Sequence, residues 1–342
     1  MHKFSPLILA VYILTEIKIL PINSLYLVSL PFIIALLVKL CYKGISNGRV
    51  FFFLYLGVLL NSILIRGSVQ LGVIFALTLS LYFINFSKVL IRTRIWELIF
   101  YSYVLFIAYR FYSVILPDFV FINKSRNYIS FYGLMLAVGA ALSLKERDKG
   151  FLHVAALNLI LSFYAIGRNG IVTSSLLLTI AIWHSLRRRS IISRITIIGA
   201  LVLVGVSLWS YYLSYMNMFD TGGRVDRYSS LRFFEDDGGR TTILNSYLNE
   251  IGVVQFFFGV DADVIFLPTN KARIYDHLHS SLLNLHSVLG ISAIFLLVYI
   301  LIKGMQKSLV YVALVVVVLL RSSTDIGLFF SPFDALLWLL VL

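Results

Sequence analysis

The chain has 342 residues, of which 60% are hydrophobic and 13% are charged, and its formal net charge at pH 7 is +13. Soluble domains carry about 25% charged residues, so this composition excludes an ordinary soluble domain. The single cysteine, Cys41, excludes an intramolecular disulfide framework and a cysteine-based metal site. We therefore expect an all-α integral membrane protein.

Long apolar segments follow one another along the whole chain. A helix needs about 20 residues to cross the hydrocarbon core of a bilayer, and the lengths of these segments predict about twelve membrane-spanning helices. The segments lie near residues 5–20, 24–40, 49–65, 69–87, 96–116, 128–144, 151–166, 169–186, 191–212, 281–302, 308–321 and 324–342. The links between them are short except for residues 213–280. The sequence thus predicts a polytopic bundle forming a single membrane domain over 1–342, with one large loop.

The basic residues are distributed unevenly between alternate links. If the N-terminus is cytoplasmic, the cytoplasmic links hold sixteen Lys and Arg residues and the short links on the other face hold six. The positive-inside rule states that cytoplasmic loops carry such an excess of Lys and Arg. It therefore predicts cytoplasmic termini and a periplasmic 213–280 loop in a bacterial inner membrane. The same bias explains the net charge through contacts with anionic membrane lipids, so no nucleic-acid partner is predicted.

The long loop contains a second kind of pattern. Two Gly-Gly-Arg turns occur at 222–224 and 238–240, and apolar residues at helical spacing follow the second turn. These apolar residues are Ile243, Leu244, Tyr247, Leu248 and Ile251. The pattern predicts an amphipathic helix after Arg240 that either lies on the membrane surface or caps the bundle.

Three cationic or basic side chains occupy distinctive positions on the predicted periplasmic face. Arg168 links two spans, Arg240 precedes the loop helix, and His279 precedes the span that begins near residue 281. Helix N-termini favour bound anions and keep a nearby imidazole neutral. Each residue also has an ordinary explanation: a headgroup contact for Arg168, a loop ion pair with Asp236 or Asp237 for Arg240, and a solvated side chain for His279.

A metal site is a further alternative near the end of the loop. Asp276, His277, His279 and His286 are close in sequence, but they match no specific metal-binding spacing. We therefore predict no metal.

Two charged residues fall inside predicted spans. Arg110 lies in 96–116 and Asp334 in 324–342, where an unpaired charge is costly. We expect Asp334 to face the protein interior and to be hydrogen-bonded or paired, with Arg110 or Arg321 as candidate partners.

The arrangement of these residues over about 160–300 resembles a known family. Gly167-Arg168 lies between consecutive spans, Gly239-Arg240 begins the loop helix, and His279-Ser280 is followed by nine residues and Gly290. This pattern resembles the superfamily of Wzy-type O-antigen polymerases and O-antigen ligases, which are membrane glycosyltransferases of the GT-C kind. The further glycine usual in ligases is missing after Gly290, which favours a polymerase.

The resemblance implies a metal-independent reaction without cofactors on oligosaccharides linked to undecaprenyl pyrophosphate. Arg168 and Arg240 would bind the pyrophosphate, and His279 would accept the proton of the attacking sugar hydroxyl. Further substrate contacts are expected from Arg224, Arg273 and Asp276. The implied partners are the lipid-linked oligosaccharide, membrane lipids, and a chain-length regulator and flippase of the same pathway.

Three other functions stay open at this point. A ligase would transfer finished polymer to lipid A–core. A transporter is disfavoured because the sequence shows neither an internal repeat nor matching broken spans. A scaffold without catalysis would leave Arg168 and His279 freely replaceable.

Overall fold

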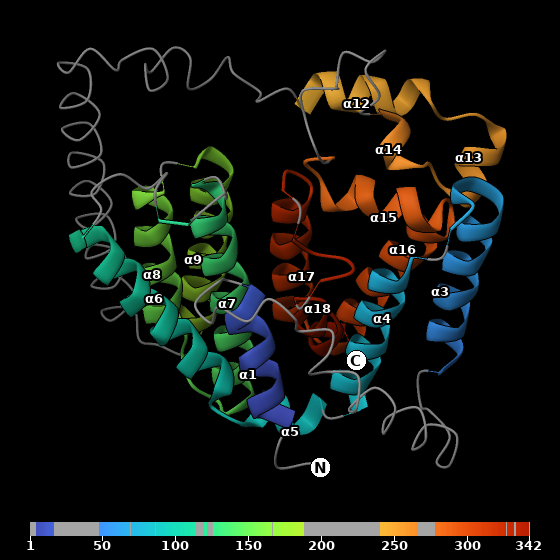
Figure 1. Cartoon of the computed structure of the whole chain (residues 1–342). Helices are drawn as coiled ribbons and strands as arrows, with labels where there is room; N and C mark the ends of the chain where they lie inside the picture. The colour runs from blue at the N-terminus through green and yellow to red at the C-terminus, as the bar shows by residue number, and fades with distance from the viewer. Residues whose placement is uncertain are drawn as a thin grey trace, which may run out of the picture.

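The computed structural model describes most of the chain. It covers residues 5–16, 48–68, 70–85, 87–113, 120–121, 126–165, 167–187, 240–265, 278–325, 327–331 and 333–341. Every regular element within these ranges is a helix (Figure 1), so the described part of the protein is all-α as expected. The predicted spans 24–40 and 191–212 lie outside the described residues.

The helices described before residue 114 form the N-terminal part of the bundle. They are α1 (Ser5–Glu16), α3 (Gly48–Asn61), the π-helix η1 (Ser62–Arg66), α4 (Leu71–Asn85), α5 (Ser87–Arg92) and α6 (Ile95–Ser113). Arg110 lies in the last turn of α6 and is half-buried, so it sits at a helix end.

Helix α7 (Asn127–Glu146) forms the centre of the neighbouring layer, with α8 (Leu152–Tyr164) and α9 (Arg168–Leu186) packed beside it. Every residue of α7 from Ile129 to Leu144 is buried. Small and polar residues line the contact between α8 and α9. For example, Asn158 Nδ2 donates to Ser174 Oγ at 2.8 Å. Such side chains let membrane helices approach closely and satisfy one another in an apolar setting.

Two of the described helices meet the length and apolarity required to cross a membrane. These are Asn127–Glu146 and Asn169–Leu186. Shorter apolar helices of 10–17 residues include Leu71–Ile84, Leu152–Tyr164 and Leu309–Ser322. Length and composition alone support this classification.

The expected span 281–302 is not one helix. It divides into α15 (Ser281–Leu289) and α16 (Ser292–Lys307) at Gly290. Gly290 has a positive φ of 55°, and a Cβ there would overlap the backbone of Phe257. Close approach of a distant backbone segment, which only glycine permits, therefore interrupts the helix.

The expected span 324–342 also differs from the structure. After α17 (Leu309–Ser322) the described chain turns repeatedly, and helix α18 begins only at Asp334 (Asp334–Val341). Ser, Thr, Asp and Gly residues predominate between 322 and 327, and their side chains compete with the helical hydrogen bonds. Phe329 and Phe330 both adopt positive φ, at 59° and 63°.

Asp334 stabilises this turn. Its Oδ2 accepts hydrogen bonds from the backbone N–H groups of Phe330 at 2.6 Å and Ser331 at 3.2 Å. The carboxylate is buried and hydrogen-bonded, as predicted. The suggested pairing of Asp334 with Arg321 is wrong, because Arg321 forms an ion pair with Asp325.

Three short helices lie across one end of the bundle. They are α12 (Arg240–Asn249), α13 (Val253–Phe258) and α14 (Ala262–Ile265). The predicted helix after Arg240 is confirmed: Ile243 and Tyr247 are buried and pack with Val260, Ile265 and Leu278. We call α12–α14 the cap. In Figure 1 it lies above α15.

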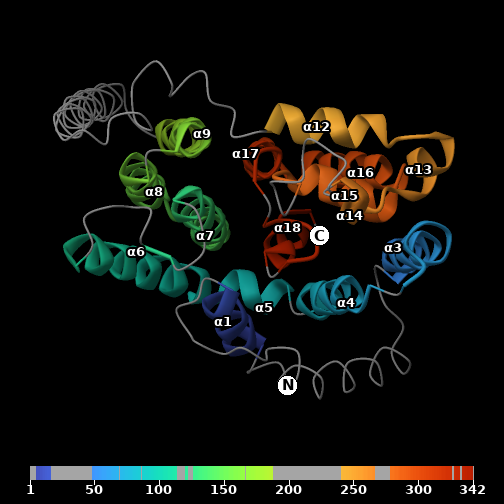
Figure 2. The ribbon, with the colours of Figure 1, turned by 45° about the horizontal axis from the view of Figure 1, so that its top comes forward.

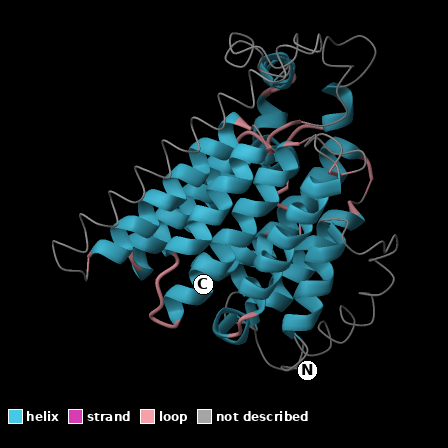
Figure 3. Cartoon of the chain, turned by 90° about the vertical axis from the view of Figure 1, so that its left-hand side faces the viewer, coloured by secondary structure: helices cyan, strands magenta, loops and turns pink. Residues whose placement is uncertain are grey.

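The helices are arranged in two groups on either side of a central pair. Figure 2 shows α6–α9 on one side, α3, α4 and α12–α16 on the other, and α17 and α18 between them. In the side view of Figure 3, most of the helices run alongside one another. This arrangement gathers several helix ends beneath the cap.

Candidate functional site

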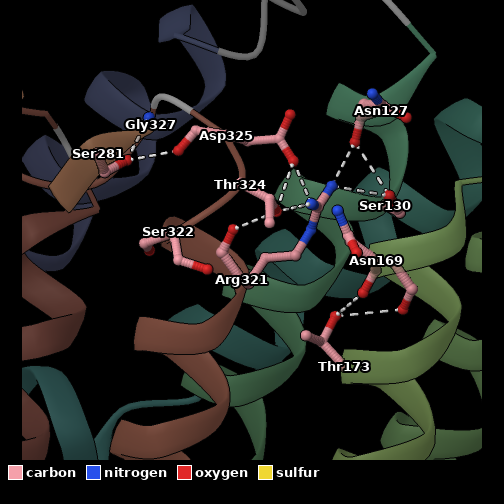
Figure 4. A network of polar contacts seen from close by, with 12 residues as sticks. Asn127, Ser130, Asn169, Thr173, Ser281, Arg321, Ser322, Thr324, Asp325 and Gly327 are labelled. Carbon is pink, nitrogen blue, oxygen red and sulfur yellow. Dashed lines mark hydrogen bonds and ion pairs between the residues drawn. The ribbon is translucent and has the colours of Figure 1, made fainter. Parts of the chain in front are cut away.

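A buried ion pair lies where helices α7 and α17 meet (Figure 4). Arg321, near the end of α17, is 1% exposed and pairs with Asp325. Its Nη2 donates to the Asn127 carbonyl at 3.0 Å and to Ser130 Oγ at 3.1 Å. Its Nη1 also donates to Thr324 Oγ1 at 3.2 Å. Arg321 thus joins the start of α7 to the end of α17.

Ser281 brings α15 to the same place. Its backbone N–H and its Oγ both donate to the Asp325 carbonyl, at 3.1 and 2.7 Å. The Ser281 Oγ in turn accepts the backbone N–H groups of Gly327 and Leu328, both at 3.1 Å. The turn after α17 is therefore fixed against the first residue of α15.

Helix α9 begins beside the start of α7. A Cβ at Gly167 would lie 3.2 Å from Asn127 Oδ1 and 3.4 Å from Ser130 Oγ, and one at Gly170 would overlap Ser130. Arg168 lies between these two glycines as the first residue of α9. The structure describes the backbone of Arg168 and not its side chain.

His279 precedes α15 in a strained conformation. Its φ of 52° lies in the left-handed region, which costs about 1–3 kcal/mol for a residue other than glycine. The flanking Leu278 and Ser280 are buried, and Ser280 Oγ caps α15 by accepting the Leu283 N–H at 3.4 Å. The neighbours therefore fix the backbone of a partly exposed histidine, and backbone strain of this kind is frequent at functional sites.

Arg240 is the first residue of α12 and lies near the buried pair. Its charge is close enough to that of Arg321 for the two to repel each other. The Arg240 Nε is buried and has no hydrogen-bond partner among the described residues. A partly desolvated cation of this kind gains stability when an anion binds to it.

The cap that carries Arg240 is fixed to α15 through a tyrosine and a histidine. The Tyr247 Oη lies 2.6 Å from His286 Nδ1. Burial raises the pKa of Tyr247, with the charge of Arg66 acting in the opposite direction. The phenol therefore stays protonated and shares a hydrogen bond with the imidazole nitrogen. The His286 ring also lies 6.4 Å from the ring of Phe256 between their centres, so His286 contacts both α12 and α13 from α15.

The structure gathers part of the predicted site. Arg240 lies one turn before Ile243, which packs in one cluster with Tyr247 and Leu278, the residue before His279. The start of α9, with Arg168, adjoins Asn127 and Ser130, which Arg321 contacts. The other expected substrate contacts, Arg224, Arg273 and Asp276, lie outside the described residues.

Sequence reasoning missed the central pair. From the sequence alone, Arg321 is expected only as a candidate partner for Asp334. Arg321 ends one predicted span and Asp325 lies near the start of the next, and their i,i+4 spacing in an apolar context is a pairing signal. On the metal question, the described residues contain no group of three His, Cys, Asp or Glu side chains able to hold an ion. Asp276 and His277 lie outside that search.

Comparison with protein-family models, curated proteins and solved structures found no match to this chain.

Proposed function

We propose that the chain is a polytopic inner-membrane glycosyltransferase, a polymerase that joins repeat units of O-antigen or a related surface polysaccharide carried on undecaprenyl pyrophosphate. The observation that carries this proposal is the position of Arg240 and His279 at one end of the bundle, beside the N-terminus of α9. A partly desolvated cation, a helix N-terminus and an imidazole on a fixed backbone suit transfer from an anionic leaving group to a hydroxyl.

The proposed reaction is one displacement at the anomeric carbon of the donor sugar. His279 removes the proton from the acceptor hydroxyl as its oxygen forms a bond to that carbon. The bond between the carbon and the pyrophosphate oxygen breaks, and undecaprenyl pyrophosphate leaves with the electron pair. Arg240, Arg168 and the free N–H groups at the start of α9 stabilise the negative charge that develops on the leaving group.

The buried Arg321–Asp325 pair has a positioning role in this proposal. It ties α7, α15 and α17 together through Asn127, Ser130 and Ser281. The charge of Arg321 is balanced by Asp325, whereas Arg240 has no such partner among the described residues. A bound pyrophosphate is therefore expected to contact Arg240 and to leave the buried pair intact.

The opposite end of the bundle supports the proposed orientation. At the end of α7, Arg147 pairs with Glu97, and the Lys145 Nζ lies 4.3 Å from the ring centre of Tyr311. Lys307 Nζ approaches the same ring from the end of α16 at 4.9 Å. Basic residues at a cytoplasmic membrane face are the expected pattern, which leaves the cap in the periplasm.

The proposal is tested by gel analysis of lipopolysaccharide from a deletion strain carrying variants of the gene. Loss of a polymerase leaves core bearing one repeat unit, whereas loss of a ligase leaves bare core. His279→Ala should lower the polymerisation rate about a hundredfold or more. His279→Gly should be equally inactive although glycine relieves the backbone strain at this position.

The arginines and a control histidine complete this test. Arg168→Ala and Arg240→Ala should remove long polymer, and Arg168→Lys should restore it only partly because an ammonium group lacks the forked grip of guanidinium on phosphate oxygens. His153 stacks on Tyr101 at the other end of the bundle, so His153→Ala should leave a full ladder. A full-length ladder from His279→Ala at normal protein level would overturn the proposal.

A further inference from the structure

Helix α13 presents an apolar surface on the outside of the cap. Val253 is 77% exposed, Val254 is 51% exposed, and Phe256 and Phe257 are also exposed. Residues 251–260 contain no charged side chain, and the acidic residues Glu250 and Asp261 flank them. A contiguous apolar patch of this kind on a water-facing surface marks an interaction site.

This patch is held firmly in place. Asn61 is fully buried, and its Nδ2 donates to the carbonyl oxygens of Phe258 at 2.7 Å and Ser287 at 3.0 Å. The N–H of Val260 also donates to the Ser287 carbonyl at 3.1 Å. A Cβ at Gly259 would overlap the backbone of Ser287, so the chain passes α15 at close range. The apolar side chains therefore point outward from a fixed support.

The patch continues an apolar face of α3 and η1, which α13 contacts. In η1, Ile63 is 65% exposed and Leu64 is also exposed. Further down the bundle the exposed residues of α3 are Phe52, Phe53, Leu56 and Leu59. In a membrane-spanning bundle this face of α3 lies against lipid, so the exposed residues of α13 extend a lipid-facing band up to the cap. The Arg66–Asp261 pair, at 3.9 Å, lies next to this band.

We infer that α13 is immersed in the outer leaflet of the membrane, at the boundary between headgroups and acyl chains. Short amphipathic helices bind there by burying their apolar side about 5–10 Å deep. Because α13 is joined through Asn61 and Gly290 to α15, the helix that His279 precedes, its immersion fixes the depth of the candidate site in the membrane. This inference rests on the membrane location of the chain and is independent of glycosyl transfer.

The depth of α13 is measured with a fluorescent probe on single cysteines. Cys41 is the only cysteine, so Cys41→Ser provides the background. Val254→Cys and Phe257→Cys are labelled with an environment-sensitive dye, and the full-length protein is reconstituted into vesicles of neutral and anionic phospholipids. Exposed Asn245 on α12 provides the water-facing control, and exposed Leu56, near the middle of the predicted span 49–65, provides the deep lipid-facing control.

Both α13 probes should emit at shorter wavelengths than the probe at Asn245. Spin-labelled lipids with the label near the headgroup should quench them at least twofold more than lipids labelled deep in the chain, with the reverse order at Leu56. Emission like that at Asn245, without quenching, would show that α13 lies in water and would overturn the inference. Blue-shifted emission without quenching by either lipid would mean contact with protein, such as a second copy, and would also overturn it.

The failure of this inference is distinguishable from failure of the proposed function. The quenching pattern does not depend on catalysis, and it can be measured in a His279→Ala protein. An inactive protein with immersed α13 would reject the reaction alone, whereas an active polymerase with water-exposed α13 probes would reject the immersion alone.

Discussion

At the residue scale, the arginines Arg321 and Arg240 differ in whether an acidic side chain balances their charge. Arg321 is buried and is matched by Asp325, with further hydrogen bonds to Asn127 and Ser130. Arg240 is partly buried and forms no ion pair with another described residue, and the Nε atoms of both arginines lack a hydrogen-bond partner there. Pairing stabilises the fold, whereas an unmatched cation favours binding of an anion. The two arginines therefore predict different variant phenotypes, one in stability and one in activity.

Asp325→Asn should strongly destabilise the protein. The substitution leaves Arg321 charged and buried without a counterion, which typically lowers the free energy of unfolding by about 3–5 kcal/mol. The measurement is the midpoint of thermal unfolding in detergent. Exposed Asp263 on α14 provides the matched control, and Asp263→Asn should change the free energy of unfolding by less than about 0.5 kcal/mol. Equal midpoints for the two variants would contradict the assigned role of the pair.

At the scale of elements, contacts between distant segments determine where helices end. The α15–α16 break occurs where the backbone of α13 passes Gly290, and α13 itself is held by Asn61 at the end of α3. The turn before α18 depends in the same way on the Asp334 carboxylate and on Ser281. These helices are shorter than the apolar segments that contain them because backbone groups at their ends bind to other elements.

Gly290→Ala should loosen the cap from the bundle. The added Cβ would collide with the Phe257 backbone and would occupy a left-handed conformation, so we expect a loss of about 1–3 kcal/mol in stability. Limited proteolysis should then cut more rapidly within 250–262. Gly72 is the matched control, because nothing lies within 4 Å of a Cβ there. Gly72→Ala should instead stabilise α4 by about 0.5–1 kcal/mol, and similar behaviour of both variants would disprove the close contact.

At the scale of the whole molecule, the proposed orientation places the cap and the candidate site in the periplasm. Alkaline phosphatase fused after Asp261 should be active, because the enzyme folds only outside the cytoplasm. A fusion within 187–190 should be inactive, since this link carries the strongest run of basic residues, Arg187 to Arg189. An active second fusion together with an inactive first fusion would reverse the orientation. The candidate site would then lie on the cytoplasmic side, away from the lipid-linked donor.

The sequence by itself determined the helical class and the loop helix after Arg240, because apolar composition and periodicity act over a few neighbouring residues. It also placed Arg240 and His279 near helix starts. Only the tertiary structure decided the Arg321–Asp325 network, the divided α15–α16 segment and the strained backbone of His279. Each of these depends on groups far along the chain, such as Asn127 for Arg321 and Phe257 for Gly290, and these groups become neighbours only when the helices pack.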